Sequence, residues 1–278
     1  MPERDTLAAM FIVAVTRWGP GLDEQLPALA EQLGLFPYDL RMRLAGPLPV
    51  IVARVAEREA ASALMAKLRE WGHGSVGCEA SKVIAGDAML QVREFRFEDE
   101  RLIVEGQGQV HGEVAAAEVL MLVHAMAVSE QHHTQETSKQ QFSAARAVLS
   151  GGLVMSRTTT TVSHANDSDS EERIYLFRRS FADPLLFRQH QLRYAGLGAA
   201  MSRSSHDNFA ELTRRLRAFA PEARYDDRLR TSRRKLDFEA ASHDQAGKTK
   251  TSTLTSSNAS GLDLAAHLLL VGLARGQL

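Results

Sequence analysis

The sequence predicts an α+β protein with two folded parts. Apolar runs at residues 11–15 and 50–55 and a short strand at 75–79 alternate with three amphipathic helices, which gives the order β-α-α-β-α-β. Several strand-like runs follow from residue 89, and an amphipathic helix comes after them. Because helices with a shared apolar direction need a sheet to cover, we expect a two-layer α/β sandwich followed by a mostly antiparallel β domain that the amphipathic helix closes.

Leucine spacing and chain breakers predict the helices of the first part. The first helix carries leucines at i, i+4, i+7 and i+11, namely Leu22, Leu26, Leu29 and Leu33. Gly34 suits the end of this helix, because glycine tolerates a positive φ. Pro37 suits the first turn of the second helix, where its missing N–H costs nothing. The third helix places Ala61, Leu64, Leu68 and Trp71 on one face, and Gly72 ends it.

The second part begins near Met89 with two strand-like runs that a polar turn separates. Residues 119–128 fit a buried strand or a helix, and the neighbouring strands favour the strand. Short strands are expected at 174–177, 185–187 and 192–194. A helix then runs from about Ser205, as N-cap, to Ala220, with an apolar face of Phe209, Leu212, Leu216 and Phe219.

Four segments follow from these patterns. We expect a small α/β sandwich domain at 1–82 and a β domain at 83–240, then a flexible low-complexity linker at 241–260 and an apolar helix at 261–278. That helix is apolar nearly all round, so it must be buried, either on its own protein or in the groove of a partner.

A long polar insertion is expected inside the β domain at 130–172. The simpler interpretation is a long hairpin, with a mobile acidic, serine-rich stretch at 166–172. In the alternative interpretation, an apolar patch at 148–155 within the insertion contacts a membrane or a partner.

Composition limits the class of protein. The chain has 278 residues, is 44% hydrophobic and carries a formal net charge of −1. Its one cysteine, Cys78, excludes an internal disulfide and favours a cytoplasmic location. We expect no signal peptide and no transmembrane segment, because no apolar run approaches the ~20 residues that a membrane span needs.

The charges are unevenly distributed. Residues 83–172 carry 6 basic and 14 acidic side chains, whereas residues 173–235 carry 15 basic and 6 acidic ones. The two blocks either neutralise each other or leave a basic face for an anionic partner. For the second case, the candidate anion-binding residues are Arg214, Arg215, Arg217, Arg224, Arg228 and Arg230.

No motif predicts a catalytic, cofactor-binding or metal-binding residue. His124 lies in an apolar segment, and His132 and His133 lie in a polar one, without a second group of paired ligands. Residues 247–249 (Gly-Lys-Thr) lack the first glycine and the following helix of a phosphate-binding loop. Asp226 and Asp227, between Arg224 and Arg228, are typical of a salt-bridged turn.

Two parts resemble known families. The element order of residues 9–80, Gly34 and the Gly72-His73-Gly74 turn resemble the C-terminal domain of the bacterial ribosomal stalk protein. The acidic residues Asp23, Glu24 and Asp39 stand where that family has a lysine-rich factor-binding face, so the resemblance implies the fold and not the ribosomal role. Residues 88–220 resemble a pleckstrin-homology-like domain in element order, which implies a binding module.

These observations favour a non-enzymatic cytoplasmic adaptor that binds a protein partner. The alternative is a peripheral binder of an anionic lipid headgroup or nucleic acid through residues 203–235. An enzyme with an unrecognised site is a second alternative, which a deep polar pocket with perturbed titratable groups would favour. The oligomeric state does not follow from the sequence.

Overall fold

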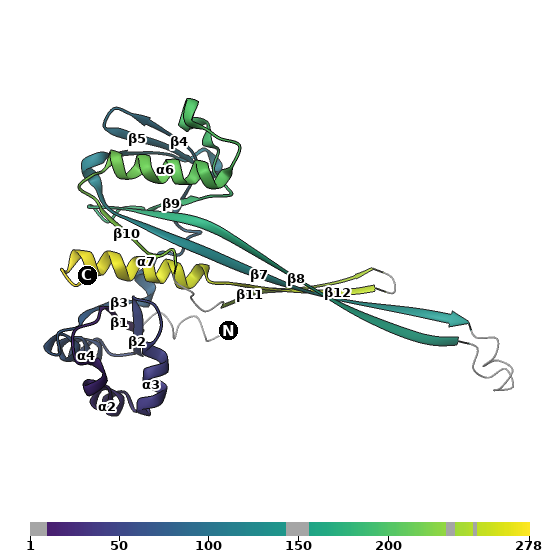
Figure 1. The fold of residues 1–278 in the computed structure, drawn as a ribbon, viewed down its shortest axis with the longest axis horizontal. Helices are drawn as coiled ribbons and strands as arrows, with labels where there is room; N and C mark the ends of the chain where they lie inside the picture. The colour runs from purple at the N-terminus through teal and green to yellow at the C-terminus, as the bar shows by residue number, and fades with distance from the viewer. Residues whose placement is uncertain (1–9, 143–155, 232–236, 247–248) are drawn as a thin grey trace. The chain divides into compact units, whose positions relative to one another are not determined.

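The computed structural model describes residues 10–142, 156–231, 237–246 and 249–278. Its helices and mostly antiparallel strands confirm the α+β class (Figure 1). The chain divides into two compact units. The first contains Met1–Ala127, Glu171–Arg234 and Ala259–Leu278, and the second contains Val128–Ser170 and Lys235–Asn258.

The predicted α/β sandwich is present at the start of the first unit. Strands β1 (Phe11–Arg17), β2 (Val50–Val55) and β3 (Gly74–Glu79) form an antiparallel sheet with the order β2-β1-β3. Helices α2 (Leu22–Leu33), α3 (Pro37–Leu44) and α4 (Arg58–Glu70) bury their leucines against this sheet. The predicted breaks are confirmed, because Gly34 has φ 64° at the end of α2 and Pro37 opens α3.

The β domain continues the first unit. Strands β4 (Leu90–Glu98), β5 (Arg101–Gly106) and β6 (His111–Ala115) form an antiparallel meander. Strand β9 (Leu185–Arg188) joins β4 to β8 (Ser156–Arg178), which lies next to β7 (Val119–Phe142). Strand β10 (Arg224–Leu229) pairs in parallel with the start of β7. The strand interpretation of residues 119–128 is therefore confirmed.

Side chains of β7 and β8 pack alternately into two hydrophobic cores, one on each face of the sheet. Leu122, Ile174 and Leu176 belong to the core beneath helix α6 (Ser205–Phe219). The residues that alternate with these along the two strands pack in a second core, together with helix α7 (Ala259–Ala274). They include Met121, Val123, Ala125, Tyr175 and Phe177. Since neighbouring strand residues point to opposite faces, α6 and α7 cover opposite faces of this sheet.

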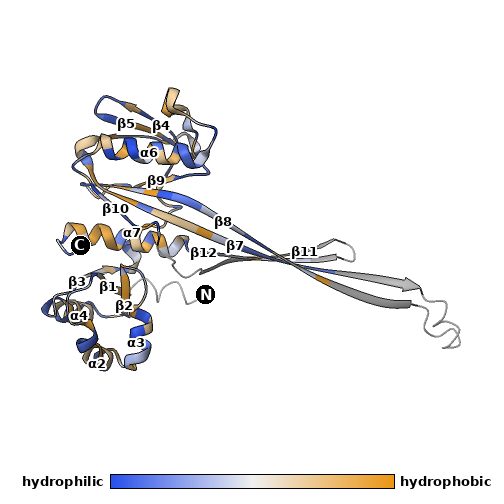
Figure 2. Cartoon of the chain, viewed as in Figure 1, coloured by the Kyte–Doolittle hydropathy of each residue, from blue (hydrophilic) through white to orange (hydrophobic). Residues whose placement is uncertain are grey.

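Helix α7 also covers the sandwich. Its Leu268 packs with Ile12, Val76 and Cys78, on the sheet face opposite to α2, α3 and α4. This double contact explains why α7 is apolar nearly all round, as its mainly orange colour in Figure 2 shows. The helix thus docks on its own chain, which decides between the two alternatives.

Buried polar contacts fix α7 and join the parts of the first unit. The carboxylate of Asp263 accepts hydrogen bonds from the Tyr175 hydroxyl at 2.8 Å and from the Gly86 backbone N–H at 2.7 Å. Arg228 donates a 2.9 Å hydrogen bond to the carbonyl of Thr16 in β1. The sandwich, the β domain and α7 are therefore linked by polar contacts as well as by apolar cores.

Two details near α6 differ from the sequence prediction. Residues 192–194 do not form a strand, because Tyr194 begins the short 3-10 helix η4 (Tyr194–Ala200) and its hydroxyl donates to the Gln189 carbonyl. The N-cap of α6 is Ser204 rather than Ser205, and its hydroxyl accepts from the Asp207 N–H. The apolar face of α6 is confirmed.

In the second unit, paired strands are found where the sequence predicts a flexible linker. Strands β11 (Asp237–Ala246) and β12 (Thr249–Ser257) form a hairpin where a flexible linker at 241–260 was expected. Strand β12 pairs with β7 from Ser257 opposite Ser129 to Thr249 opposite Thr137. The two ladders pair the backbone N–H and C=O groups of this polar, threonine-rich segment.

The insertion at 130–172 is a long hairpin over the residues that the structure describes. Strands β7 and β8 contain 24 and 23 residues, and the stretch 166–172, expected to be mobile, lies within β8. Residues 143–155, which include the patch at 148–155, fall outside the described residues.

Candidate functional site

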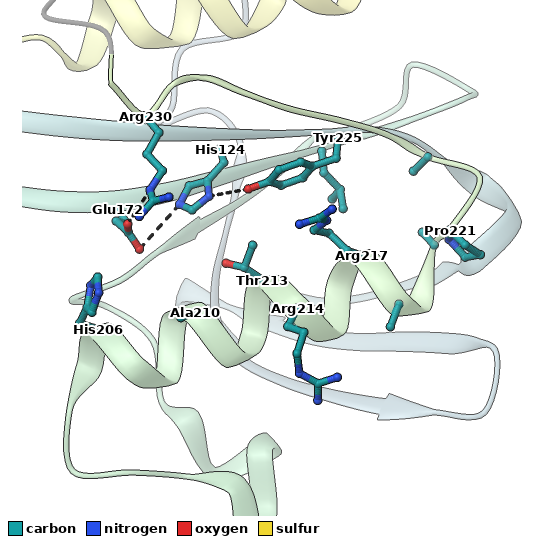
Figure 3. Close-up of a pocket in the computed structure, with 14 residues that line it drawn as sticks. His124, Glu172, His206, Ala210, Thr213, Arg214, Arg217, Pro221, Tyr225 and Arg230 are labelled. Atoms are coloured by element: carbon teal, nitrogen blue, oxygen red, sulfur yellow. Dashed lines mark hydrogen bonds and ion pairs between the residues drawn. The ribbon is translucent and has the colours of Figure 1, made fainter.

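A pocket of about 590 Å³ lies between α6 and one face of the β7–β8–β10 sheet (Figure 3). Apolar side chains line part of it, namely Leu122, Ala210, Ala218, Ala220, Pro221 and Ala223. The rest of the lining is polar or charged, namely His124, Glu172, His206, Thr213, Arg214, Arg217, Tyr225 and Arg230. The pocket thus combines an apolar surface with a group of cationic and titratable side chains.

Strand periodicity places the polar groups on this face. His124 is two residues after Leu122 in β7, and Glu172 is two residues before Ile174 in β8, so both point toward α6. The parallel register places Tyr225 of β10 opposite Leu122 of β7. Three chain segments that are distant in the sequence therefore bring a histidine, a carboxylate and a phenol together.

His124 is the central group of this cluster. Its side chain is 5% exposed, and its Nδ1 lies 2.9 Å from the Tyr225 hydroxyl. Its Nε2 is buried without a hydrogen-bond partner and lies 3.7 Å from Oε2 of Glu172. At that distance the contact is electrostatic rather than a hydrogen bond.

The titration of His124 is perturbed. Burial lowers the pKa of His124, and the nearby Arg230 guanidinium lowers it further, whereas Glu172 and Asp227 raise it. Burial also raises the pKa of the Tyr225 phenol. At neutral pH the imidazole of His124 and the phenol of Tyr225 are therefore both neutral.

Two guanidinium groups reach this cluster from different elements. Arg230 Nε lies 3.2 Å from Oε1 of Glu172. Arg217 of α6 lies over the Tyr225 ring, 4.3 Å from its centroid, and Figure 3 shows its guanidinium between α6 and that ring. Within the part of the chain that the structure describes, no carboxylate forms an ion pair with Arg217.

The other predicted anion-binding arginines have different positions. Arg214 lines the pocket edge, but Figure 3 shows its guanidinium pointing away, and it pairs with Glu211 at 2.8 Å. Arg215 pairs with the same carboxylate and donates to the Leu197 carbonyl. Arg228 pairs with Asp226, and Arg224 is exposed at the start of β10. Of the six candidates, only Arg217 and Arg230 point into the pocket.

Sequence reasoning missed His124, Glu172 and Tyr225 as site residues. From the sequence, His124 is considered only as a metal ligand, and Glu172 falls in the stretch 166–172 that is expected to be mobile. The sequence carries a signal for His124, which is the one polar residue in the apolar run 119–128, but none for Glu172, because the apolar run of β8 starts only at Ile174.

Other kinds of site are not indicated among the described residues. No group of three or more histidine, cysteine or acidic side chains there is arranged to hold a metal ion. No helix in the same part of the chain is long and apolar enough to cross a membrane. Burial raises the pKa of Cys78 to about 11, so its thiol is a poor nucleophile.

Comparison with protein-family models, curated proteins and solved structures finds no match to this chain.

Proposed function

We propose that the protein binds a small organic anion in the pocket beneath α6. The observation that carries the proposal is the convergence of Arg217 and Arg230, from separate elements, on one cavity. Arginine presents a planar set of N–H donors that suits phosphate and carboxylate groups. The volume of about 590 Å³ is in the range of pockets that hold small molecules.

The apolar lining supports an organic ligand over a bare inorganic ion. Leu122 and Ala220 are buried at the pocket wall, and the alanines of α6 add small apolar surfaces. An apolar ligand body gains from burial there, while its anionic group lies beside Arg217 and Arg230. This proposal develops the expectation of an anionic ligand and narrows the arginine-rich region to two residues.

The test is a calorimetric titration with phenyl phosphate at low salt. We expect the Arg217→Gln variant to bind at least about tenfold more weakly, because it loses a charged hydrogen-bond donor. Arg214→Gln is the matched control, since the same change three residues away removes a guanidinium that points out of the pocket.

Three results would overturn the proposal: no binding by the wild type, an equal loss in both variants, or binding that does not weaken as salt rises. Thermal unfolding of each variant shows whether its fold is intact. Inorganic phosphate in a parallel titration measures the share of the affinity that the organic body supplies.

A second candidate function is an adaptor that docks a protein partner on α3. Phe36, Tyr38 and Met42 are 77%, 71% and 61% exposed. Tyr38 and Met42 are one helical turn apart, and Phe36 immediately precedes the helix. Aromatic residues and methionine are enriched at protein interfaces, so an exposed group of three is unusual for a surface without a partner.

Site-specific photo-crosslinking tests the adaptor function. A crosslinker at position 42 should capture one defined protein in native cytoplasm, and Phe36→Ser should abolish the capture. The same crosslinker at position 110, where Val110 is 51% exposed, is the control. Identical products at both positions would contradict docking on α3.

A further inference from the structure

We propose that the anion enters this pocket together with a proton, which His124 holds between Tyr225 and Glu172. The inference rests on the proposed function and adds its regulation, namely an affinity that rises as the pH falls. It begins from the position of Glu172, whose carboxylate lies between Arg230 and His124.

Glu172 needs a positive neighbour in the pocket wall. Its side chain is 3% exposed, and an isolated carboxylate at that depth is costly. Without ligand, Arg230 supplies the positive charge at 3.2 Å. The Arg230 side chain is 48% exposed, so its guanidinium has room to turn toward an anion in the pocket.

His124 is placed to replace Arg230 as the partner of Glu172. Its side chain is 5% exposed and fixed in β7, and its unpartnered Nε2 faces Oε2 of the carboxylate. When the imidazole takes a proton from solvent, both ring nitrogens carry hydrogen. Nδ1–H then donates to the Tyr225 oxygen, and Nε2–H points at Glu172. The protonated ring therefore has an acceptor on each side.

The charged groups around His124 favour this exchange. Glu172 faces it from β8, Tyr225 and Asp227 from β10, Arg230 from the turn after β10, and Arg217 and His206 line the pocket from α6. In the free protein, burial and Arg230 lower the pKa of His124. An anion that draws Arg230 away removes one lowering influence and adds a negative charge, so the pKa of His124 rises on binding.

The test is the number of protons taken up per bound anion. Sulfate is the probe, because its charge is constant between about pH 5 and 8, where histidine titrates. Calorimetry in buffers of contrasting ionisation enthalpy should show uptake of up to one proton by the wild type. The dissociation constant should fall by up to about tenfold for each unit of decreasing pH between the free and bound pKa values of His124.

Three variants locate the proton. His124→Gln should bind sulfate without proton uptake, and Glu172→Gln should lose the uptake because the imidazolium then lacks its carboxylate. His111→Asn is the control, since this exposed histidine of β6 does not line the pocket and its loss should leave the uptake unchanged.

The outcomes separate this inference from the proposed function. Sulfate binding by the wild type without proton uptake, or with an affinity independent of pH, overturns the inference and leaves the anion site standing. Uptake that persists in His124→Gln overturns the assignment to His124. If neither sulfate nor phenyl phosphate binds at any pH, the anion site itself fails.

Discussion

At the scale of single residues, local pairing decides what each arginine does. Glu211 accepts hydrogen bonds from Arg214 and Arg215 on the surface of α6. These two guanidinium groups lower the pKa of the Glu211 carboxyl to about 2. Arg217, one turn further along α6, lies over the Tyr225 ring instead. Neighbouring arginines on one helix therefore have different surroundings, a surface ion pair for Arg214 and Arg215 and the pocket for Arg217.

The Glu211 carboxyl gives a direct check of this division. Arg214→Gln should raise the pKa of Glu211 toward its ordinary value of 4.5, whereas Arg217→Gln should leave it near 2. The depressed pKa also means that the two ion pairs stabilise the fold above about pH 4.5 and that this contribution is lost as the pH falls toward 2. A pH titration of the carboxyl carbon by NMR measures both variants, and equal shifts in the two would contradict the division.

Part of this residue-level arrangement was predictable. Arginine density identified the region of Arg217 and Arg230, because charge counts need no fold. The position of His124 opposite Glu172 was not predictable, since the two lie 48 residues apart and meet only through the register of β7 and β8. A shift of one residue in either strand would turn one of them to the other face of the sheet.

At the scale of elements, helices followed from the sequence more reliably than strands. The leucine spacing of α2 and α4 and the capping glycine and proline are local signals, and the structure confirms them. Strands β11 and β12 were not predicted from the sequence, because they form by pairing between segments, β11 with β12 and, over a long range, β12 with β7. Threonine favours strands, but residues 249–257 also contain serine and lysine and have Leu254 as their one large apolar residue, so their composition alone does not distinguish a linker from a paired strand.

The buried face of α4 is open to a stability measurement. Leu68 is fully buried against the sheet, so Leu68→Ala should lower the free energy of unfolding by about 2–5 kcal/mol. Met42→Ala is a suitable control, because its side chain is 61% exposed and the change should cost little. Urea unfolding measures both variants, and a loss below about 0.5 kcal/mol for Leu68→Ala would contradict the burial of this face.

At the scale of the whole molecule, α7 packs against both the sandwich and the β domain, so we expect the stability of each part to depend on the other. The sandwich was expected to be complete within residues 1–82, yet Ile12, Val76 and Cys78 on its second sheet face pack against Leu268 of α7. No local pattern in residues 1–82 indicates which segment covers that face, because the segment lies about 180 residues later in the chain.

Two expectations therefore follow for a fragment of residues 1–82. It should unfold cooperatively, because its three strands and three helices share one core, but at a lower midpoint temperature than the full chain. It should also bind a hydrophobic dye at the uncovered sheet face. A non-cooperative melt would show that the sandwich does not fold alone, and a midpoint equal to that of the full chain would show that α7 contributes nothing.

The most direct test of the proposed anion site beneath α6 is to locate a bound anion in a crystal structure. Crystals of the full chain soaked with selenate would reveal the anion by its anomalous scattering. We expect one principal site, with oxygen atoms within hydrogen-bond distance of Arg217 and Arg230 and with Arg230 turned away from Glu172. Selenate bound only at Arg214, Arg215 or Arg224, with the pocket empty and the Arg230–Glu172 pair intact, would contradict the proposed anion site.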